Sequence, residues 1–155
     1  MKKQKGFSLV ELLVVVSIIL ILAAVAIPNY IKSKCTANEA AAIGALRTIG
    51  IANWNYAAAC PDIGYSVSLS ELNTGTLCPA MVGMIDFNLS NNIRSGYNFN
   101  YTSQTLGTVN ALYTVTAVPL KIGVSGYRGF FVDQSQQIRF SNNGTAPTVG
   151  SPELQ

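Results

Sequence analysis

The chain has 155 residues and a formal net charge of +3; 49% of its residues are hydrophobic, only 11% are charged, and none is histidine. Its length suits one domain, and the shortage of charge indicates a segment that is covered by lipid or by protein. Without histidine the chain lacks the usual general base and the commonest metal ligand, and it has no glycine-rich phosphate loop, so we expect no enzyme activity and no cofactor.

The chain begins with a basic leader, in which Lys2, Lys3 and Lys5 precede an apolar run over residues 7–27. These 21 residues would form about 31 Å of helix, which is enough to cross the hydrocarbon core of a bilayer. Positive charge before a span holds that end in the cytoplasm, so we expect the rest of the chain to face outward. Since three of the ten basic residues lie in this leader, the remaining seven only balance the seven acids, and we expect no nucleic-acid partner.

The start of the chain carries a specific pattern. It resembles the N-terminus of the type IV pilin and pseudopilin family in the apolar run and at these positions: Lys5, Gly6, Phe7, Ser8, Leu9, Glu11 and Pro28. The resemblance covers about a fifth of the chain. It implies that a prepilin peptidase cleaves between Gly6 and Phe7 and methylates the new N-terminus at Phe7. The alternative is an ordinary secretory signal that is cleaved after Ala26, the end of an A-x-A triplet.

Glu11 is the one charged residue within the apolar run. A charge at the centre of a membrane span costs about 2.5–3.5 kcal/mol, so it favours a functional explanation. After cleavage the amine of Phe7 lies four residues before Glu11, and in a stack of identical subunits a neighbour's amine is the best available cation. We therefore expect Glu11 to set the register of assembly, the role that the resemblance also implies. The alternative is that Glu11 only reaches the membrane surface from near the end of the span.

A helical pattern continues past the span, and we expect one long helix over residues 7–59. Its second half should pack on a head through a face that contains Ile43, Leu46, Ile49 and Gly50. Pro28 removes a backbone donor and predicts a kink or a local break. The resemblance implies a helix that loosens there in filaments, whereas a proline without any such role is the alternative.

The head is predicted to be α+β. Residues 61–80 read as a loop with one short helical turn, for which Ser68 and Glu71 match a capping box, and residues 81–95 read as loop. Alternation predicts strands at 97–102 and 111–118, followed by a hairpin of 127–132 and 137–141 around a loop at 133–136. We expect a sheet of three or four antiparallel strands closed over the helix. The glycines and prolines after residue 141 predict an irregular and mobile tail.

Three cysteines allow three pairings. Cys35 and Cys60 are 25 residues apart on the expected helix, about 37 Å, which excludes a bond between them. Cys60 and Cys78 both precede a proline and border the same loop, so we predict their disulfide in an exported chain, worth about 3 kcal/mol. Cys35 is then either a buried small residue or a contact to another molecule.

Asp62, Asp86 and Asp133 are isolated in the sequence, whereas a calcium loop needs several oxygens close together, so we expect no metal site. The resemblance makes this informative, because the major pseudopilins of type II secretion typically hold calcium near their C-terminus. The sequence thus favours a pilin over a pseudopilin.

We therefore expect the structural subunit of a type IV pilus, with a pseudopilin of type II secretion as the alternative. A membrane-tethered binding domain that does not assemble is a second alternative. The expected partners are other copies of the chain, the prepilin peptidase, the assembly machinery and, before assembly, membrane lipid. The prepilin would cross the inner membrane once, and the assembled pilus would be extracellular. The expected parts are a leader (1–6), a membrane and filament-core helix (7–28), a head helix (29–59), a globular head (60–141) and a tail (142–155).

Overall fold

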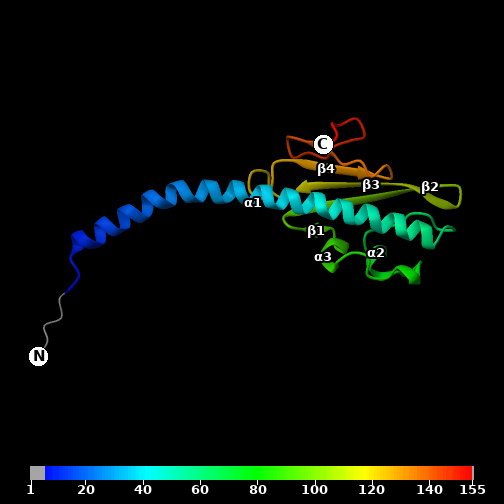
Figure 1. Ribbon diagram of the computed structural model, residues 1–155, viewed down its shortest axis with the longest axis horizontal. Coiled ribbons are helices and arrows are strands. Elements are labelled where there is room, and N and C mark those ends of the chain that lie inside the picture. The colour runs from blue at the N-terminus through cyan, green and yellow to red at the C-terminus, as the bar shows by residue number, and fades with distance from the viewer. Residues whose placement is uncertain (1–5, 155) are drawn as a thin grey trace, which may run out of the picture.

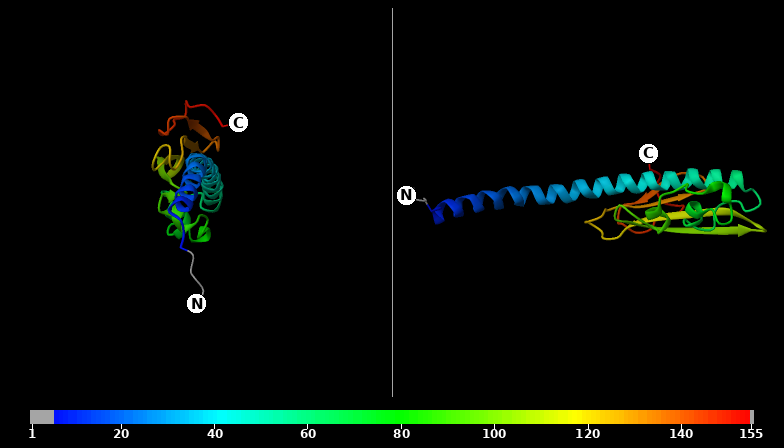
Figure 2. Two further views of the ribbon diagram at one scale, coloured as in Figure 1. Left: turned by 90° about the vertical axis from the view of Figure 1, so that its left-hand side faces the viewer. Right: turned by 90° about the horizontal axis from the view of Figure 1, so that it is seen from below.

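The computed structural model describes residues 6–154, so most of the expected leader lies outside the described residues. One long helix, α1 (Leu9–Ala59), packs with its second half on a five-stranded antiparallel sheet. Figure 1 shows the first half of α1 projecting from the head, and Figure 2 shows the second half lying along the sheet. This α+β architecture confirms the predicted fold class.

Helix α1 is continuous for 51 residues and has two different surfaces. Its first half is exposed, whereas from Cys35 onward one face is buried. Leu46, Ile49 and Gly50 lie on that face and Ile43 is partly buried beside it, which confirms the predicted contact with the head. The helix begins at Leu9, two residues after the predicted start, because Ser8 has the extended backbone (φ −75°, ψ 140°) of a residue that caps a helix.

The sheet has five strands in sequence order, so the expected three or four is wrong by at least one. They are β1 (Ile93–Arg94), β2 (Tyr97–Leu106), β3 (Val109–Pro119), β4 (Gly129–Asp133) and β5 (Arg139–Ser141). The predicted hairpin around 133–136 is confirmed by the antiparallel pairing of β4 with β5. The strand that the sequence did not reveal is β1, which has two residues and therefore shows no alternating pattern. It forms because Ser95 and Gly96, at φ +49° and +74°, turn the chain back onto β2.

Three short helices fill the segment between α1 and the sheet: α2 (Glu71–Thr74), η1 (Pro79–Met81) and α3 (Phe87–Ser90). The first is the expected helical turn, but its capping box is only half formed. The Ser68 hydroxyl accepts from the backbone N–H of Glu71 at 3.2 Å, while the Glu71 carboxylate turns to other donors inside the head. Helix α3 lies where we expected loop, and the Asp86 carboxylate caps it by accepting from the N–H of Leu89 at 2.9 Å.

The core lies between the buried face of α1 and the sheet. Its largest fully buried side chains come from both layers and from the short helices: Leu46, Ile49, Tyr56, Leu69, Leu72, Leu89, Tyr97, Phe99, Tyr113, Val115, Phe130 and Val132. In β2 the burial alternates from Tyr97 through Phe99, as the sequence pattern predicted. The helix and the sheet therefore fold as one unit.

The tail after residue 141 is irregular, as expected, but its last residues are tied to β5. The N–H of Phe140 donates to the Pro152 carbonyl at 3.0 Å, and the N–H of Leu154 donates to the Ile138 carbonyl at 2.7 Å. An ion pair of 2.8 Å between Arg139 and Glu153 lies beside them. The expectation of a loose tail is therefore wrong for these last residues. The sequence pattern does not reveal these contacts between the tail and β5, because most of them are hydrogen bonds between backbone groups.

Candidate functional site

The first turn of α1 and the three residues before it hold the cleavage and assembly residues predicted from the sequence. Gly6 and Phe7 are exposed, and the Glu11 carboxylate accepts from the backbone N–H of Ser8 at 3.0 Å. This bond satisfies one of the free N–H groups at the helix start, and the positive end of the helix dipole favours the negative charge. Glu11 is thus held next to the position where cleavage after Gly6 would create an amine. One bond leaves the exposed carboxylate with capacity for a further donor.

The rest of the first half of α1 is an uncovered apolar surface. The helix is long and apolar enough to cross a membrane, and none of its most apolar 18-residue window is buried against the head. Side chains on every side of it are exposed, from Phe7 at 75% to Ile27 at 58%. An apolar surface of this size is not stable in water, so it requires a lipid or protein environment.

Pro28 lies within α1, and the helix is not broken there. Figure 1 shows that the projecting half bends away from the axis of the second half. The predicted local break is therefore absent from the isolated chain. The predicted loosening at Pro28 concerns the assembled filament and stays a prediction.

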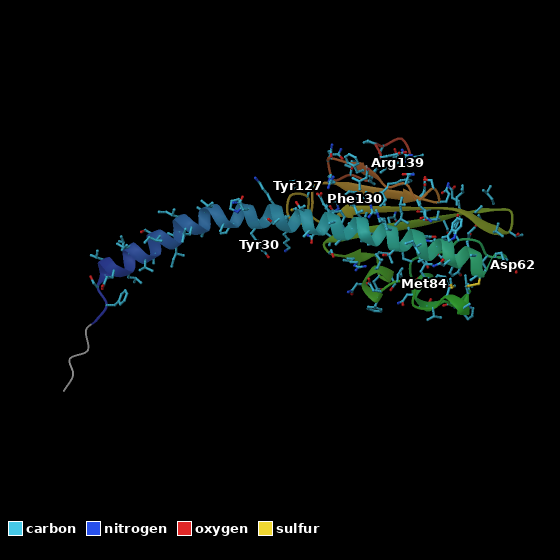
Figure 3. The ribbon with its side chains drawn as sticks, in the orientation of Figure 1. Tyr30, Asp62, Met84, Tyr127, Phe130 and Arg139 are labelled. Carbon is cyan, nitrogen blue, oxygen red and sulfur yellow. A yellow bond between two sulfur atoms is a disulfide. The ribbon has the colours of Figure 1, made fainter. Side chains whose placement is uncertain are left out.

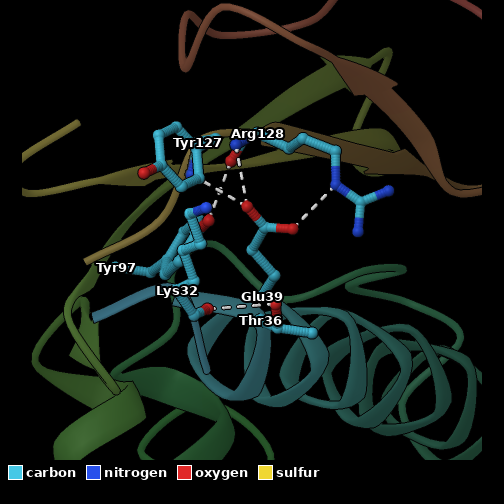
Figure 4. A network of polar contacts seen from close by, with 6 residues as sticks. All are labelled: Lys32, Thr36, Glu39, Tyr97, Tyr127 and Arg128. Carbon is cyan, nitrogen blue, oxygen red and sulfur yellow. Dashed lines mark hydrogen bonds and ion pairs between the residues drawn. The ribbon is translucent and has the colours of Figure 1, made fainter. Parts of the chain in front are cut away.

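A buried carboxylate fixes α1 to the head just beyond this region. Glu39 accepts from the backbone N–H groups of Tyr127 at 2.8 Å and Arg128 at 3.1 Å, and its second oxygen accepts from Arg128 Nε at 2.7 Å (Figure 4). The Tyr97 hydroxyl donates to the Arg128 carbonyl at 2.9 Å, and burial, reinforced by the charge of Glu39, raises the pKa of that hydroxyl. Glu39 is not among the site residues predicted from the sequence. The feature that could have identified it is that Glu39 is the one acid in α1 besides Glu11.

The disulfide between Cys60 and Cys78 is present and joins the end of α1 to η1, with the two Cα atoms 6.2 Å apart (Figure 3). A second buried carboxylate lies next to it. Glu71 accepts from the Tyr56 hydroxyl at 3.1 Å and from the N–H groups of Leu77 at 2.7 Å and Cys78 at 3.3 Å. Burial and the bond to Glu71 raise the pKa of Tyr56 to about 12. Glu71 therefore organises the disulfide loop from inside.

Cys35 is buried at 1% exposure, which supports the interpretation of a small core residue over that of an exposed contact. The three isolated aspartates have separate local roles or none. Asp86 caps α3 and pairs with Arg94, while Asp133 accepts from Ser135. Within residues 6–154 no group of three or more cysteine, aspartate or glutamate side chains is placed to hold a metal ion.

Comparison with known proteins agrees with the geometry of the N-terminal segment. Residues 1–27 match the family description "Prokaryotic N-terminal methylation motif". A stretch of 39 residues is 54% identical to the type IV wide pilus major component PilA4 of Thermus thermophilus. That stretch covers 25% of this chain and 30% of the relative. No solved structure matches the chain significantly. The motif, the relative and the helix-on-sheet fold together support a relationship to the type IV pilin family in its broad sense, which includes the pseudopilins.

Proposed function

We propose that this chain is the structural subunit of a type IV pilus. It is made as a prepilin, is cleaved after Gly6, is methylated on the amine of Phe7, and then polymerises with its apolar helices at the centre. It crosses the inner membrane once before assembly, with its N-terminus in the cytoplasm and its head outside. The similarity to a pilus major component supports this proposal over a secretion pseudopilin.

The observation that carries the proposal is the exposed apolar half of α1. A soluble monomer would leave this surface in water, whereas a bilayer covers it before assembly and neighbouring copies of the same helix cover it afterwards. Because the head covers only the second half of α1, the first half is free to pack against several neighbours. The same surface therefore serves as a membrane anchor and as a polymer contact.

In this polymer the Glu11 carboxylate gains a second hydrogen-bond donor. In the single chain its carboxylate accepts from the N–H of Ser8. In the filament it also accepts from the methylated amine of Phe7 in an adjacent copy, a charge-assisted bond that is stronger than a neutral one. A carboxylate buried among apolar helices without that amine is strongly unfavourable, so only one axial offset between neighbours is stable. Glu11 thereby selects the register, and the apolar residues supply the buried area.

The test is to shear the surface of cells that express the chain and to identify the filament protein by mass spectrometry. Filaments composed of this chain, with methylated Phe7 at the N-terminus, are the expected result, and cells that lack the gene are the control. If the chain instead stays with the cell envelope and its loss stops protein export without removing filaments, it is a pseudopilin. A chain that remains monomeric in the membrane under all conditions would exclude both.

A further inference from the structure

The connection between β3 and β4, residues 120–128, presents an unusual surface. Four of its apolar side chains keep between 43% and 58% of their surface exposed: Leu120, Ile122, Val124 and Tyr127. Figures 1 and 2 show this loop at the end of the head from which the first half of α1 projects. The loop therefore carries exposed apolar side chains at the end of the head from which the first half of α1 projects.

The loop is held in place by its polar groups. Asn38 Nδ2 donates to the Ser125 carbonyl at 2.8 Å, and Glu39 binds the N–H groups of Tyr127 and Arg128. Inside the loop the Ser125 hydroxyl accepts from the N–H of Lys121 at 2.9 Å. Since these bonds fix the backbone on two residues of α1, the exposure of the apolar side chains is a feature of the folded head.

The position of the loop along α1 fits the layer of lipid headgroups. Ile31 is partly buried while its neighbours on the helix are exposed, so the head begins to cover α1 four residues past Ile27, about 6 Å along the axis. Val124 lines one surface depression with Lys34, about 10 Å past the same residue. The headgroup region adds about 5–7 Å to each side of the hydrocarbon core, so the loop at Lys34 lies about 3–5 Å from the outer surface of that region.

The charges around the loop favour an anionic surface. Lys32, Lys34 and Lys121 are exposed, and none of the ion pairs found between residues 6 and 154 involves them. The acid that contacts the loop, Glu39, is buried and bonded to Arg128. Tyr30 and Tyr127 lie at the same end of the head (Figure 3), and tyrosine is enriched where hydrocarbon meets water.

We propose that residues 120–128, with Tyr30, Lys32 and Lys34, form a membrane-resting face that docks on anionic phospholipid headgroups before assembly. This inference rests on the proposed function, because it requires α1 to span the bilayer. Apolar side chains of the loop contact the outer surface of the headgroup layer, and the lysines attract the phosphates. Docking would hold the head in one orientation relative to the membrane, and the head has to leave the headgroups when the subunit enters the filament.

The test uses tryptophan fluorescence of the full mature chain in vesicles that contain lipids brominated near the headgroup. Trp54 is the one tryptophan of the chain and is exposed, so Trp54→Phe provides a background for single probes. Leu120→Trp probes the loop. Leu106→Trp is the matched control, because its exposure of 59% is close to the 58% of Leu120 and it lies at the opposite end of the head. Leu20→Trp, measured with lipids brominated deep in their acyl chains, reports whether the span is inserted, because Leu20 lies about 10 Å along α1 from Ile27.

In vesicles of phosphatidylcholine and phosphatidylglycerol, we expect bromine to quench Leu120→Trp several-fold more than Leu106→Trp. We expect the difference to shrink in phosphatidylcholine alone, and also when Lys32, Lys34 and Lys121 are replaced by glutamine. Equal quenching of the two probes, with Leu20→Trp strongly quenched, would overturn the membrane-resting face and leave the proposed function intact. Quenching of Leu120→Trp that changes with the density of subunits in the vesicle would assign the face to a second copy instead. No quenching of Leu20→Trp would overturn both proposals.

Discussion

Glu39 in α1 and Arg128, the last residue before β4, are 89 residues apart in the sequence, yet their side chains meet at 2.7 Å. The Glu39 side chain is 8% exposed, and it also binds two backbone N–H groups of the β3–β4 loop. This one carboxylate therefore joins the helix to the sheet at the end of the head from which the first half of α1 projects. Three charge-assisted bonds satisfy it, as a buried carboxylate requires.

Glu39→Ala should destabilise the head by about 2–4 kcal/mol, because two N–H groups and Arg128 lose their acceptor. Chemical denaturation of the full chain in detergent, followed by circular dichroism, measures this change. Glu153→Ala is the matched control, since the side chain of Glu153 is 53% exposed and its pair with Arg139 should contribute less than about 1 kcal/mol. Equal effects of the two substitutions would show that Glu39 does not anchor the head.

Removal of the disulfide by the double substitution Cys60→Ser and Cys78→Ser should cost about 3 kcal/mol, because the unfolded chain gains the entropy of an open loop. Alkylation followed by mass spectrometry checks the pairing itself. We expect a single modified cysteine, Cys35, when the chain is denatured without reductant, and three after reduction. Modification of Cys60 before reduction would contradict the assignment.

Glu11→Ala should leave the subunit inserted and cleaved but should abolish filaments, because the neighbour's amine at Phe7 loses its partner. Recovery of sheared filaments, relative to the amount of subunit in the membrane, is the measurement. Ser17→Ala is the control within the same span, since the Ser17 hydroxyl donates only to the Val14 carbonyl of its own helix. A normal yield of Glu11→Ala filaments would remove Glu11 from the assembly contact.

Gly6→Ala should leave the leader attached, as shown by N-terminal sequencing or intact mass. Among the described residues, no atom outside the direct chain neighbours lies within 4 Å of the position that a Cβ at Gly6 would occupy, so the described fold tolerates alanine and a processing defect would reflect the peptidase. Gly44→Ala offers the same open space inside α1 and should be processed normally. Complete cleavage of Gly6→Ala would contradict the proposed role of this glycine.

Stability should fall in alkali. The pKa of Tyr56 is raised from 10.0 to about 12, so the folded state keeps a proton that the unfolded state has lost. The stabilisation is complete below pH 10 and declines as the pH rises toward 12, by up to about 1.4 kcal/mol per pH unit for one tyrosine. Burial also raises the pKa values of Tyr97, Tyr101 and Tyr113, which adds to the slope.

Denaturation midpoints at pH 9, 10 and 11 measure this dependence, and Tyr56→Phe should make the slope shallower. Tyr127→Phe is the matched control, because it removes the hydroxyl of a tyrosine that is 45% exposed. A midpoint that does not move between these pH values would contradict the prediction.

The sequence alone determined the features that depend on local pattern and composition. The motif from Gly6 to Glu11, the apolar run, the long helix and the two central strands follow from charge, periodicity and turn residues close to one another in the chain. The disulfide between Cys60 and Cys78 was also predictable, because the geometry of a helix excludes a bond between Cys35 and Cys60, and because Cys60 and Cys78 border the same loop. These features can be predicted without knowing which distant segments of the chain pack against them.

Only the tertiary structure decided which polar groups hold the head together. Glu39 and Glu71 look like surface acids in the sequence, and they are buried because backbone N–H groups and side chains from distant segments converge on them. The two-residue strand β1 exists because β2 offers it a free edge, and the tail is ordered because β5 does the same. Hydrogen bonds to backbone groups leave little trace in residue type, so the position of the loop at residues 120–128 could not be predicted from the sequence.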